Sequence, residues 1–287
     1  MTILVYAVIA ICALVFACAT IERAVKYARH PIHLRWELYP VPHEGAGRVA
    51  AMVPEILFLE GLWAFNRRLW LRSFPFHFGL YLIASAGVGL LVMAGVARLA
   101  GLDWLGAPVG QAAAWIVAAT GSLGLVLALF GAVALLHRRA TEPALRAYTT
   151  AGDVFNLVFF AAALGTLGAG YVTRPEGSPG ALSIVIGLLS WDHSVRVPAL
   201  LAAGLMSTAA LVAYIPLTHM SHFIGKYFTY HAVRWDDAPL GRDPKMSAAL
   251  AEYLTYRPTW AAAHIRAKGS PTWGEVVTTN PTDEGRR

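Results

Sequence analysis

Apolar residues in this chain gather into long unbroken runs, each longer than one face of a water-soluble helix or strand would supply. A helix that crosses a bilayer needs about 20 mostly apolar residues. Five stretches meet this requirement, at residues 3–20, 76–97, 111–136, 154–171 and 197–224. The pattern therefore predicts an all-α integral membrane protein, in which five spanning helices form a bundle.

Three features of the pattern need a separate interpretation. The run at 181–189 is too short to cross a bilayer. The run at 53–71 is interrupted by charged residues, so it predicts an amphipathic helix on the membrane surface. These charged residues are Glu55, Glu60, Arg67 and Arg68. Basic residues follow the first run instead of preceding it, so we expect a retained span and no cleaved signal peptide.

The composition agrees with a membrane protein. Hydrophobic residues make up 57% of the chain and charged residues only 14%, whereas soluble chains have roughly 45–50% and about 25%. Two cysteines, Cys12 and Cys18, exclude a disulfide scaffold. They also exclude an iron–sulfur cluster held by this chain alone, since such a cluster needs about four thiolates.

The net charge of +6 is distributed in blocks between the apolar runs, which indicates contact with a membrane surface and not with nucleic acid. Twenty of the 23 lysines and arginines lie in segments 21–75, 137–153 and 225–287, all on one side of the predicted membrane. The positive-inside rule places that side in the cytoplasm and the N-terminus outside. We expect a multi-pass protein of the cytoplasmic (inner) membrane.

Two of these cytoplasmic segments are much longer than the connections of about eight residues that join neighbouring helices. The loop 21–75 and the tail 225–287 are rich in Trp, Tyr, Pro and Arg, which suit a partner surface. A tail lying on lipid headgroups is the alternative, although seven of the 17 acidic residues lie in it. We predict a five-span membrane domain, 1–224, and a tail, 225–287, that docks a partner subunit.

Three of the ten histidines fall within predicted spans, where an ionisable group is costly and usually functional. His77 follows Arg72 at the start of the second span, and His222 precedes Lys226 at the end of the fifth. Because these basic residues mark one interface, the two histidines share a depth. His219 lies one turn farther into the fifth predicted span.

Two histidines on different helices at one depth can bind both faces of a haem, and Gly79 would leave space beside His77. The chain has no CxxCH motif, so the haem would be of the b type. His219 is an alternative ligand, or a donor to a propionate or a quinone oxygen. Arg72 and Lys226 are candidates for the same contacts, or they are plain interfacial anchors.

Other interpretations stay open at this point. Each histidine could be a buried neutral residue bonded to a backbone carbonyl. A zinc site could use His219 as a third ligand, but no cysteine or paired carboxylate lies at that depth. A proton relay would need acidic residues within the spans, and essentially none is predicted there. A transporter is disfavoured by the same lack of carboxylates and by the lack of broken-helix repeats.

The strings SFPFHFGLYL, around His77, and YIPLTHMSHFIGKYF, around His222, resemble the cytochrome b (gamma) subunit of respiratory nitrate reductase. The resemblance extends over all five spans, and WELYPVPHE in the first loop looks like the branch found in heterodisulfide-reductase-like complexes. It implies two stacked b haems in such proteins, with His77 and His222 matching the inner ligands. The outer ligand positions are Gly87 and Gly204, so we expect one haem b.

The resemblance implies an electron-transfer subunit of a respiratory redox complex. It would exchange electrons between membrane quinone and a cytoplasmic iron–sulfur partner of the heterodisulfide-reductase type. No residue is assigned to catalysis, and whether the chain itself counts as an enzyme, of the quinone oxidoreductase type, stays undecided. The alternative is a non-redox membrane anchor or assembly subunit of such a complex.

Overall fold

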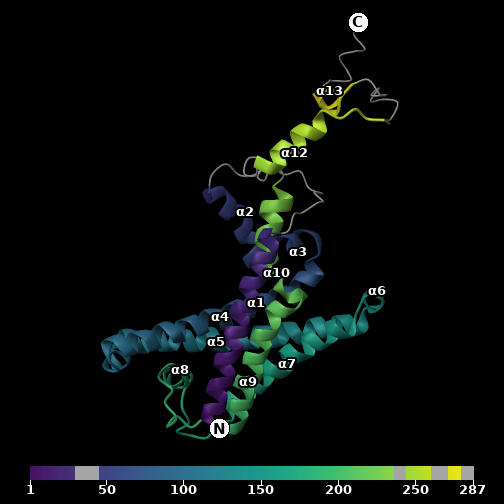
Figure 1. Cartoon of the computed structure of the whole chain (residues 1–287). Coiled ribbons are helices and arrows are strands. Elements are labelled where there is room, and N and C mark those ends of the chain that lie inside the picture. The colour runs from purple at the N-terminus through teal and green to yellow at the C-terminus, as the bar shows by residue number, and fades with distance from the viewer. Residues whose placement is uncertain (30–44, 236–243, 260–270, 279–287) are drawn as a thin grey trace. The chain divides into compact units, whose positions relative to one another are not determined.

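The computed structural model describes residues 1–29, 45–235, 244–259 and 271–278, and the elements within these ranges are helices. Five segments are long and apolar enough to cross a membrane. They are α1 (Thr2–Arg29), α4 (Arg67–Ala100), α5 (Pro108–Thr141), α7 (Ala151–Val172), and α9 (Ala199–Tyr214) with the 3-10 turn η2 (Ile215–Leu217) (Figure 1). The predicted all-helical, five-span fold is confirmed, and the chain is a multi-pass membrane protein. The direction of insertion stays a prediction.

The chain divides into two compact units. The first combines Met1–Lys26 with Val49–Ile224 and contains the five spans. The second combines Tyr27–Arg48 with Gly225–Arg287. Most of the described part of the second unit is helical, with the π-helix η4 (Thr229–Arg234), α12 (Pro244–Leu254) and α13 (Trp273–Thr278). The partner-docking role of the tail stays a prediction.

The pair α4 and α5 packs backbone against backbone, and α7 lies on α5 (Figure 1). A side chain at Gly79 would place its Cβ 2.4 Å from the backbone nitrogen of Ala128, and one at Gly131 would meet Phe76 equally closely. Small residues allow this close approach in membrane helices. The buried core here contains Phe76, Ala128, Ala132, Phe160, Ala163, Leu164 and Leu211.

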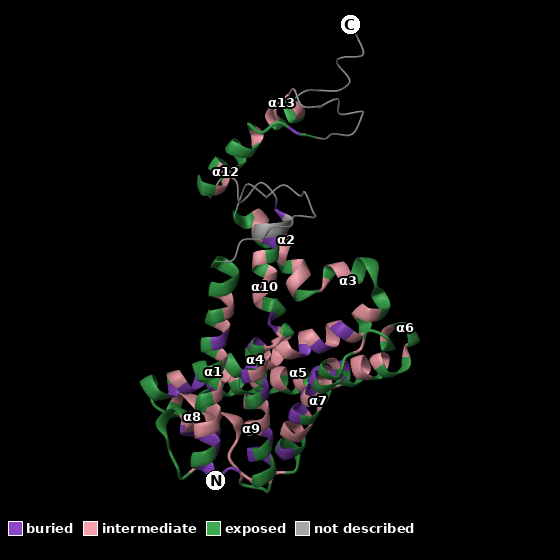
Figure 2. Cartoon of the chain, turned by 45° about the vertical axis from the view of Figure 1, so that its right-hand side comes forward, coloured by how far each residue is buried: buried purple, intermediate pink, exposed green. Residues whose placement is uncertain are grey.

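A second buried cluster joins the N-terminal half of α1 to α9 and to α8 (Ala181–Ser190), a helix too short to span, as expected for 181–189 (Figure 2). It contains Val5, Tyr6, Ile184, Val197, Leu201 and Ala202. The hydroxyl of Thr2 donates to the carbonyl of Val195 at 2.8 Å, which holds the start of α1 on the same group. We call this cluster the apolar end of the first unit.

The single surface helix predicted over 53–71 is wrong. The structure has α2 (Gly45–Leu57), α3 (Glu60–Phe65) and then the start of α4. Leu59 ends the first piece with a left-handed backbone (φ 54°), and the Glu55 carboxylate accepts a bond from the Gly61 amide at 2.7 Å. Asn66 caps α4 by accepting from the amide of Leu69 at 3.1 Å. These local polar bonds compete successfully with one continuous helix.

Candidate functional site

His77 is held in place by its own helix. Its Nδ1 lies 2.8 Å from the backbone carbonyl of Ser73 and 3.2 Å from the Ser73 hydroxyl. Because a carbonyl oxygen can only accept, Nδ1 carries the proton and Nε2 keeps its lone pair. Histidines that bind metals are usually oriented through this kind of bond from the second ring nitrogen.

The fifth span breaks just before His222, so the continuous helix predicted over 197–224 is wrong. After η2 the chain becomes extended at Thr218 (φ −119°, ψ −177°), turns through η3 (His219–Ser221), and enters α10 (His222–Phe228). Pro216 has no amide hydrogen for the helix ladder, and the Thr218 hydroxyl accepts from the amide of Met220 at 3.3 Å. The expectation that His219 lies one helical turn before His222 in a continuous span therefore does not hold.

The carbonyls released by this break are bound by α1. The guanidinium of Arg23 donates to the carbonyl of Pro216 at 3.1 Å and to that of Leu217 at 3.3 Å. A membrane interior supplies no water to such groups, so broken helices persist only where protein groups satisfy them. Arg23 therefore fixes the segment that leads into His222.

The break brings His222 to His77. Their ring centres are 6.0 Å apart, with an angle of 68° between the ring planes. Two metal–nitrogen bonds of about 2 Å, arranged in line, would separate the ligating nitrogens by about 4 Å. Because each ring centre lies behind its nitrogen, the observed separation is compatible with both histidines binding one iron. Histidine nitrogens are among the ligands that haem iron accepts.

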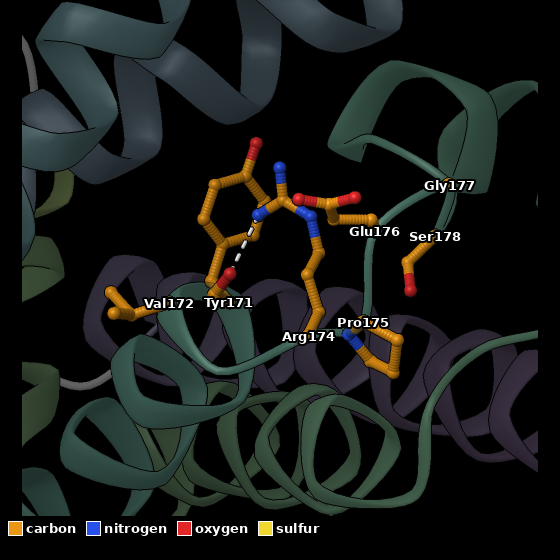
Figure 3. Close-up of a pocket in the computed structure, with 7 residues that line it drawn as sticks. All are labelled: Tyr171, Val172, Arg174, Pro175, Glu176, Gly177 and Ser178. Carbon is orange, nitrogen blue, oxygen red and sulfur yellow. Dashed lines mark hydrogen bonds between the residues drawn. The ribbon is translucent and has the colours of Figure 1, made fainter.

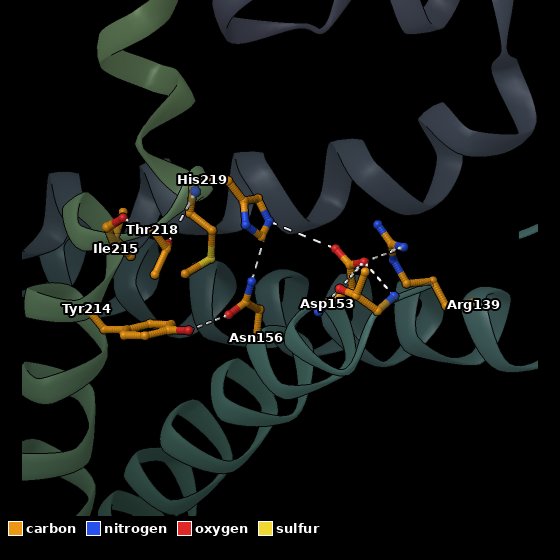
Figure 4. A network of polar contacts seen from close by, with 9 residues as sticks. Arg139, Asp153, Asn156, Tyr214, Ile215, Thr218 and His219 are labelled. Carbon is orange, nitrogen blue, oxygen red and sulfur yellow. Dashed lines mark hydrogen bonds and ion pairs between the residues drawn. The ribbon is translucent and has the colours of Figure 1, made fainter. Parts of the chain in front are cut away.

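His219 lies outside this pair and faces α7. Its Nε2 is 3.5 Å from the amide nitrogen of Asn156 and 4.0 Å from a carboxylate oxygen of Asp153 (Figure 4). Tyr214 donates to the amide oxygen of Asn156 at 3.0 Å, and Arg139 lies 3.5 Å from the Asp153 carboxylate. The structure thus assembles a polar network at the end of the first unit that contains His77 and His222. We call this region the histidine end.

The other predicted site residues lie on α4 and α10. Arg72 donates to the carbonyl of Arg68 at 3.4 Å on its own helix. Lys226 follows His222 by one turn of α10, and its ammonium lies 5.7 Å from the ring centre of Tyr230. The space expected beside Gly79 is occupied by the α5 backbone, so this glycine serves helix packing.

The two glycines at the expected outer ligand positions differ from each other. A Cβ built at Gly87 meets nothing within 4 Å, whereas one at Gly204 would lie 2.5 Å from the Cα of Leu167 in α7. The α7–α9 contact therefore fills the position that a ligand on the fifth span would need. No group of three or more His, Cys, Asp or Glu converges within the described ranges.

Sequence reasoning missed several residues of the histidine end. Ser73 could have been predicted as a partner of His77, because it precedes His77 by one helical turn. Asp153 was missed because the fourth span was predicted to begin at residue 154, whereas α7 starts at Ala151 and includes Asp153 in its first turn. No sequence signal connects Arg23 to Pro216, which is 193 residues away.

The pocket drawn in Figure 3 lies away from these residues. It has a volume of about 450 Å³ and is lined by the loop that follows α7, including Arg174 and Glu176. The guanidinium of Arg174 stacks 3.8 Å above the ring of Tyr171 and donates to its carbonyl at 2.6 Å. The pocket contains none of the predicted site residues.

Five apolar helices within the described ranges define the class of a multi-pass membrane protein, and His77 of α4 lies close to His222 at the start of α10. A family model described as "Nitrate reductase gamma subunit" matches residues 63–235. The chain therefore belongs to the nitrate reductase gamma subunit family, whose members are membrane cytochrome b subunits of redox complexes. The match begins at Trp63, so it covers four of the five spans and not α1, whereas a resemblance over all five was expected. Comparisons with curated proteins and with solved structures found no match.

Proposed function

We propose that this chain is a haem b subunit that exchanges electrons between membrane quinone and a cytoplasmic iron–sulfur partner of the heterodisulfide-reductase type. The observation that supports it most is the 6.0 Å separation of the His77 and His222 rings, together with the bond that orients His77. When bound, the haem supplies a one-electron stage between two-electron quinone chemistry and single-electron clusters. His77 and His222 would hold its iron.

The proposal specifies one haem per chain. The histidine end offers two axial nitrogens, while the position of Gly204 is filled by the contact between α9 and α7. Arg72 and Lys226 are proposed as basic groups near the membrane surface that bind a propionate or a quinone oxygen. The proposed orientation, with the histidine end toward the cytoplasm, follows from the positive-inside distribution of lysine and arginine.

The docking partner is proposed from composition. The chain has two cysteines, and both lie in α1, so clusters must come from another subunit. The segments 21–75 and 225–287 supply the aromatic and arginine residues suited to its surface. Mass spectrometry of the complex isolated through a tag on this chain should identify a cytoplasmic subunit with cluster-binding cysteines.

A visible spectrum of the purified protein tests the haem directly. Oxidised and dithionite-reduced samples should show a sharp reduced alpha band from a bis-histidine haem. The band should disappear in His77→Ala and His222→Ala and persist in His193→Ala, a histidine outside the spans. A folded wild-type protein without the band would reject electron transfer and favour the non-redox membrane anchor.

A further inference from the structure

The environment of His219 suits both of its protonation states. Tyr214 donates to the amide oxygen of Asn156, which leaves the amide nitrogen as a donor toward His219 Nε2. That contact serves the neutral ring. Asp153 presents a carboxylate oxygen at 4.0 Å to the same nitrogen, which serves the protonated ring. A histidine required only for packing would need one of these partners, and not both.

Asp153 is anchored so that one oxygen faces His219. Its Oδ2 accepts bonds from the amide of Thr150 at 3.0 Å and from the Thr150 hydroxyl at 2.8 Å, and Arg139 lies 3.5 Å from it. Its Oδ1 is the atom near His219. The Asp153 side chain is 18% exposed, and one of its oxygens is held by Thr150 and Arg139 while the other faces the more exposed ring of His219.

His219 is accessible in spite of these contacts. Its side chain is 69% exposed, although Nε2 faces Asn156 and Asp153 of α7. Asn156, in contrast, is buried at 6% exposure within a spanning helix. Polar residues at such positions are rare and usually functional. One side of the ring is thus fixed by the protein and the other is available to a ligand.

His219 belongs to the end of the first unit that holds the proposed haem ligands. It precedes His222 by three residues, and the next residue, Met220, packs on the core cluster that contains Phe76. Phe76 itself precedes His77 and contacts Phe160, one turn from Asn156 on α7. The charged groups around His219 are Asp153 from α7, Arg139 behind it on α5, and Arg23 of α1 on the adjoining break.

From these observations we infer that His219, supported by Asp153 and Asn156, binds the headgroup oxygen of a quinone and exchanges its proton. The inference rests on the proposed function. Oxidation of a quinol breaks two O–H bonds and releases two protons and two electrons. With a haem held between His77 and His222, the two electrons would pass to it one at a time and from there to the iron–sulfur partner. His219 takes the two protons in turn and returns each through Asp153 to water, and reduction of a quinone reverses these transfers.

Binding of a non-reducing analogue tests the inference apart from turnover. The probe is a fluorescent hydroxyquinoline N-oxide, titrated into the purified complex after its haem content has been measured. His219→Ala should weaken binding by about tenfold, the effect of losing one hydrogen bond with partial desolvation. The reduced haem spectrum should be unchanged. His193→Ala is the matched control and should bind the analogue as the wild type does.

Two further variants separate proton exchange from binding. His219→Gln keeps a hydrogen-bonding group that cannot accept a proton, so it should retain the analogue and lose quinol-driven haem reduction. Asp153→Asn should also retain the analogue and slow that reduction, while reduction by dithionite stays normal. If His219→Ala also loses haem, His219→Gln decides: normal quinol-driven reduction would overturn the inference, and its loss with haem retained would support it.

The failure of this inference is distinguishable from the failure of the proposed function. Wild-type protein without haem would end both. Two results with haem-loaded protein would together overturn the role of His219. In the first, His219→Ala binds the analogue as tightly as the wild type, and in the second, His219→Gln leaves quinol-driven reduction unchanged. The proposal of a haem subunit would then stay intact.

Discussion

The two ends of the first unit differ in the side chains that fill them. At the histidine end, a broken helix, two neighbouring histidines and a network of polar side chains around His219 lie among the spans (Figure 4). At the apolar end, α1, α8 and α9 pack around Tyr6, Leu201 and Ala202. Polar atoms are costly in a membrane unless they are bonded or used. The contrast supports the proposal that the haem is held at the histidine end.

The largest effect on haem occupancy is expected from the loss of one of the two histidines proposed to hold the haem. His222→Ala should lower haem occupancy by more than about tenfold, because changes in the surrounding shell alone cost about 10–100-fold in metal affinity. Pyridine hemochrome assays on equal amounts of folded protein measure the effect. Full occupancy in both His222→Ala and His77→Ala would show that the iron is bound elsewhere.

The second largest effect is expected when the bonds that hold the helix break before His222 are removed. Arg23→Ala removes two donors from the carbonyls of Pro216 and Leu217, and a bond from a charged group contributes about 1.5–3 kcal/mol. The midpoint temperature of thermal unfolding in detergent should therefore be lower, and the alpha band of the reduced haem should broaden or shift. Arg23→Lys should recover part of both effects.

The control for this prediction is Arg98→Ala. Arg98 donates one exposed bond, to the carbonyl of Leu189, at the apolar end. Its loss should leave the haem spectrum unchanged. Equal spectral effects in the two arginine variants would mean that Arg23 acts on general stability and not on the position of His222.

A third comparison uses the two glycines at the outer ligand positions. Gly204→Ala should destabilise the protein by about 1–3 kcal/mol, the usual cost of overpacking a tight contact, because its Cβ would meet the backbone of Leu167 at 2.5 Å. Gly87→Ala has open space and should be tolerated. Thermal unfolding of the two variants measures the difference in their stability. Equal tolerance would show that the apolar end can open, which would weaken the single-haem proposal.

The smallest effect is expected at Ser73. Ser73→Ala removes the hydroxyl 3.2 Å from His77 Nδ1 and keeps the backbone carbonyl at 2.8 Å, which is the principal acceptor. Haem content should be normal, and the midpoint potential should move slightly in a redox titration. Loss of haem in this variant would contradict the assignment of the carbonyl as the group that orients His77.

The spans and the histidine pair were predictable for different reasons. Runs of apolar residues long enough to cross a bilayer leave few alternatives, so five spans followed directly. His77 and His222 could be singled out because ionisable residues within those runs are so few. Their closeness could be expected only from shared depth, and the structure adds the facing rings.

The break at Pro216–Thr218 and its partners could not be predicted. A proline near the end of an apolar run is compatible with a kinked but continuous membrane helix, and the sequence does not distinguish the two. Arg23 looked like one of many basic residues following a span, and Asp153 lay one residue outside the predicted fourth span. Contacts such as these depend on tertiary packing between distant segments, for which local patterns contain no signal.

The most direct test of the central claim is the number of haems in each chain. A pyridine hemochrome assay, combined with quantitative amino-acid analysis of the purified complex, measures this ratio. The histidine pair at one end and the filled contact at Gly204 predict one haem b for each copy of this chain. A ratio of two would show that the apolar end also binds haem, and a ratio of zero in folded protein would remove the electron-transfer role.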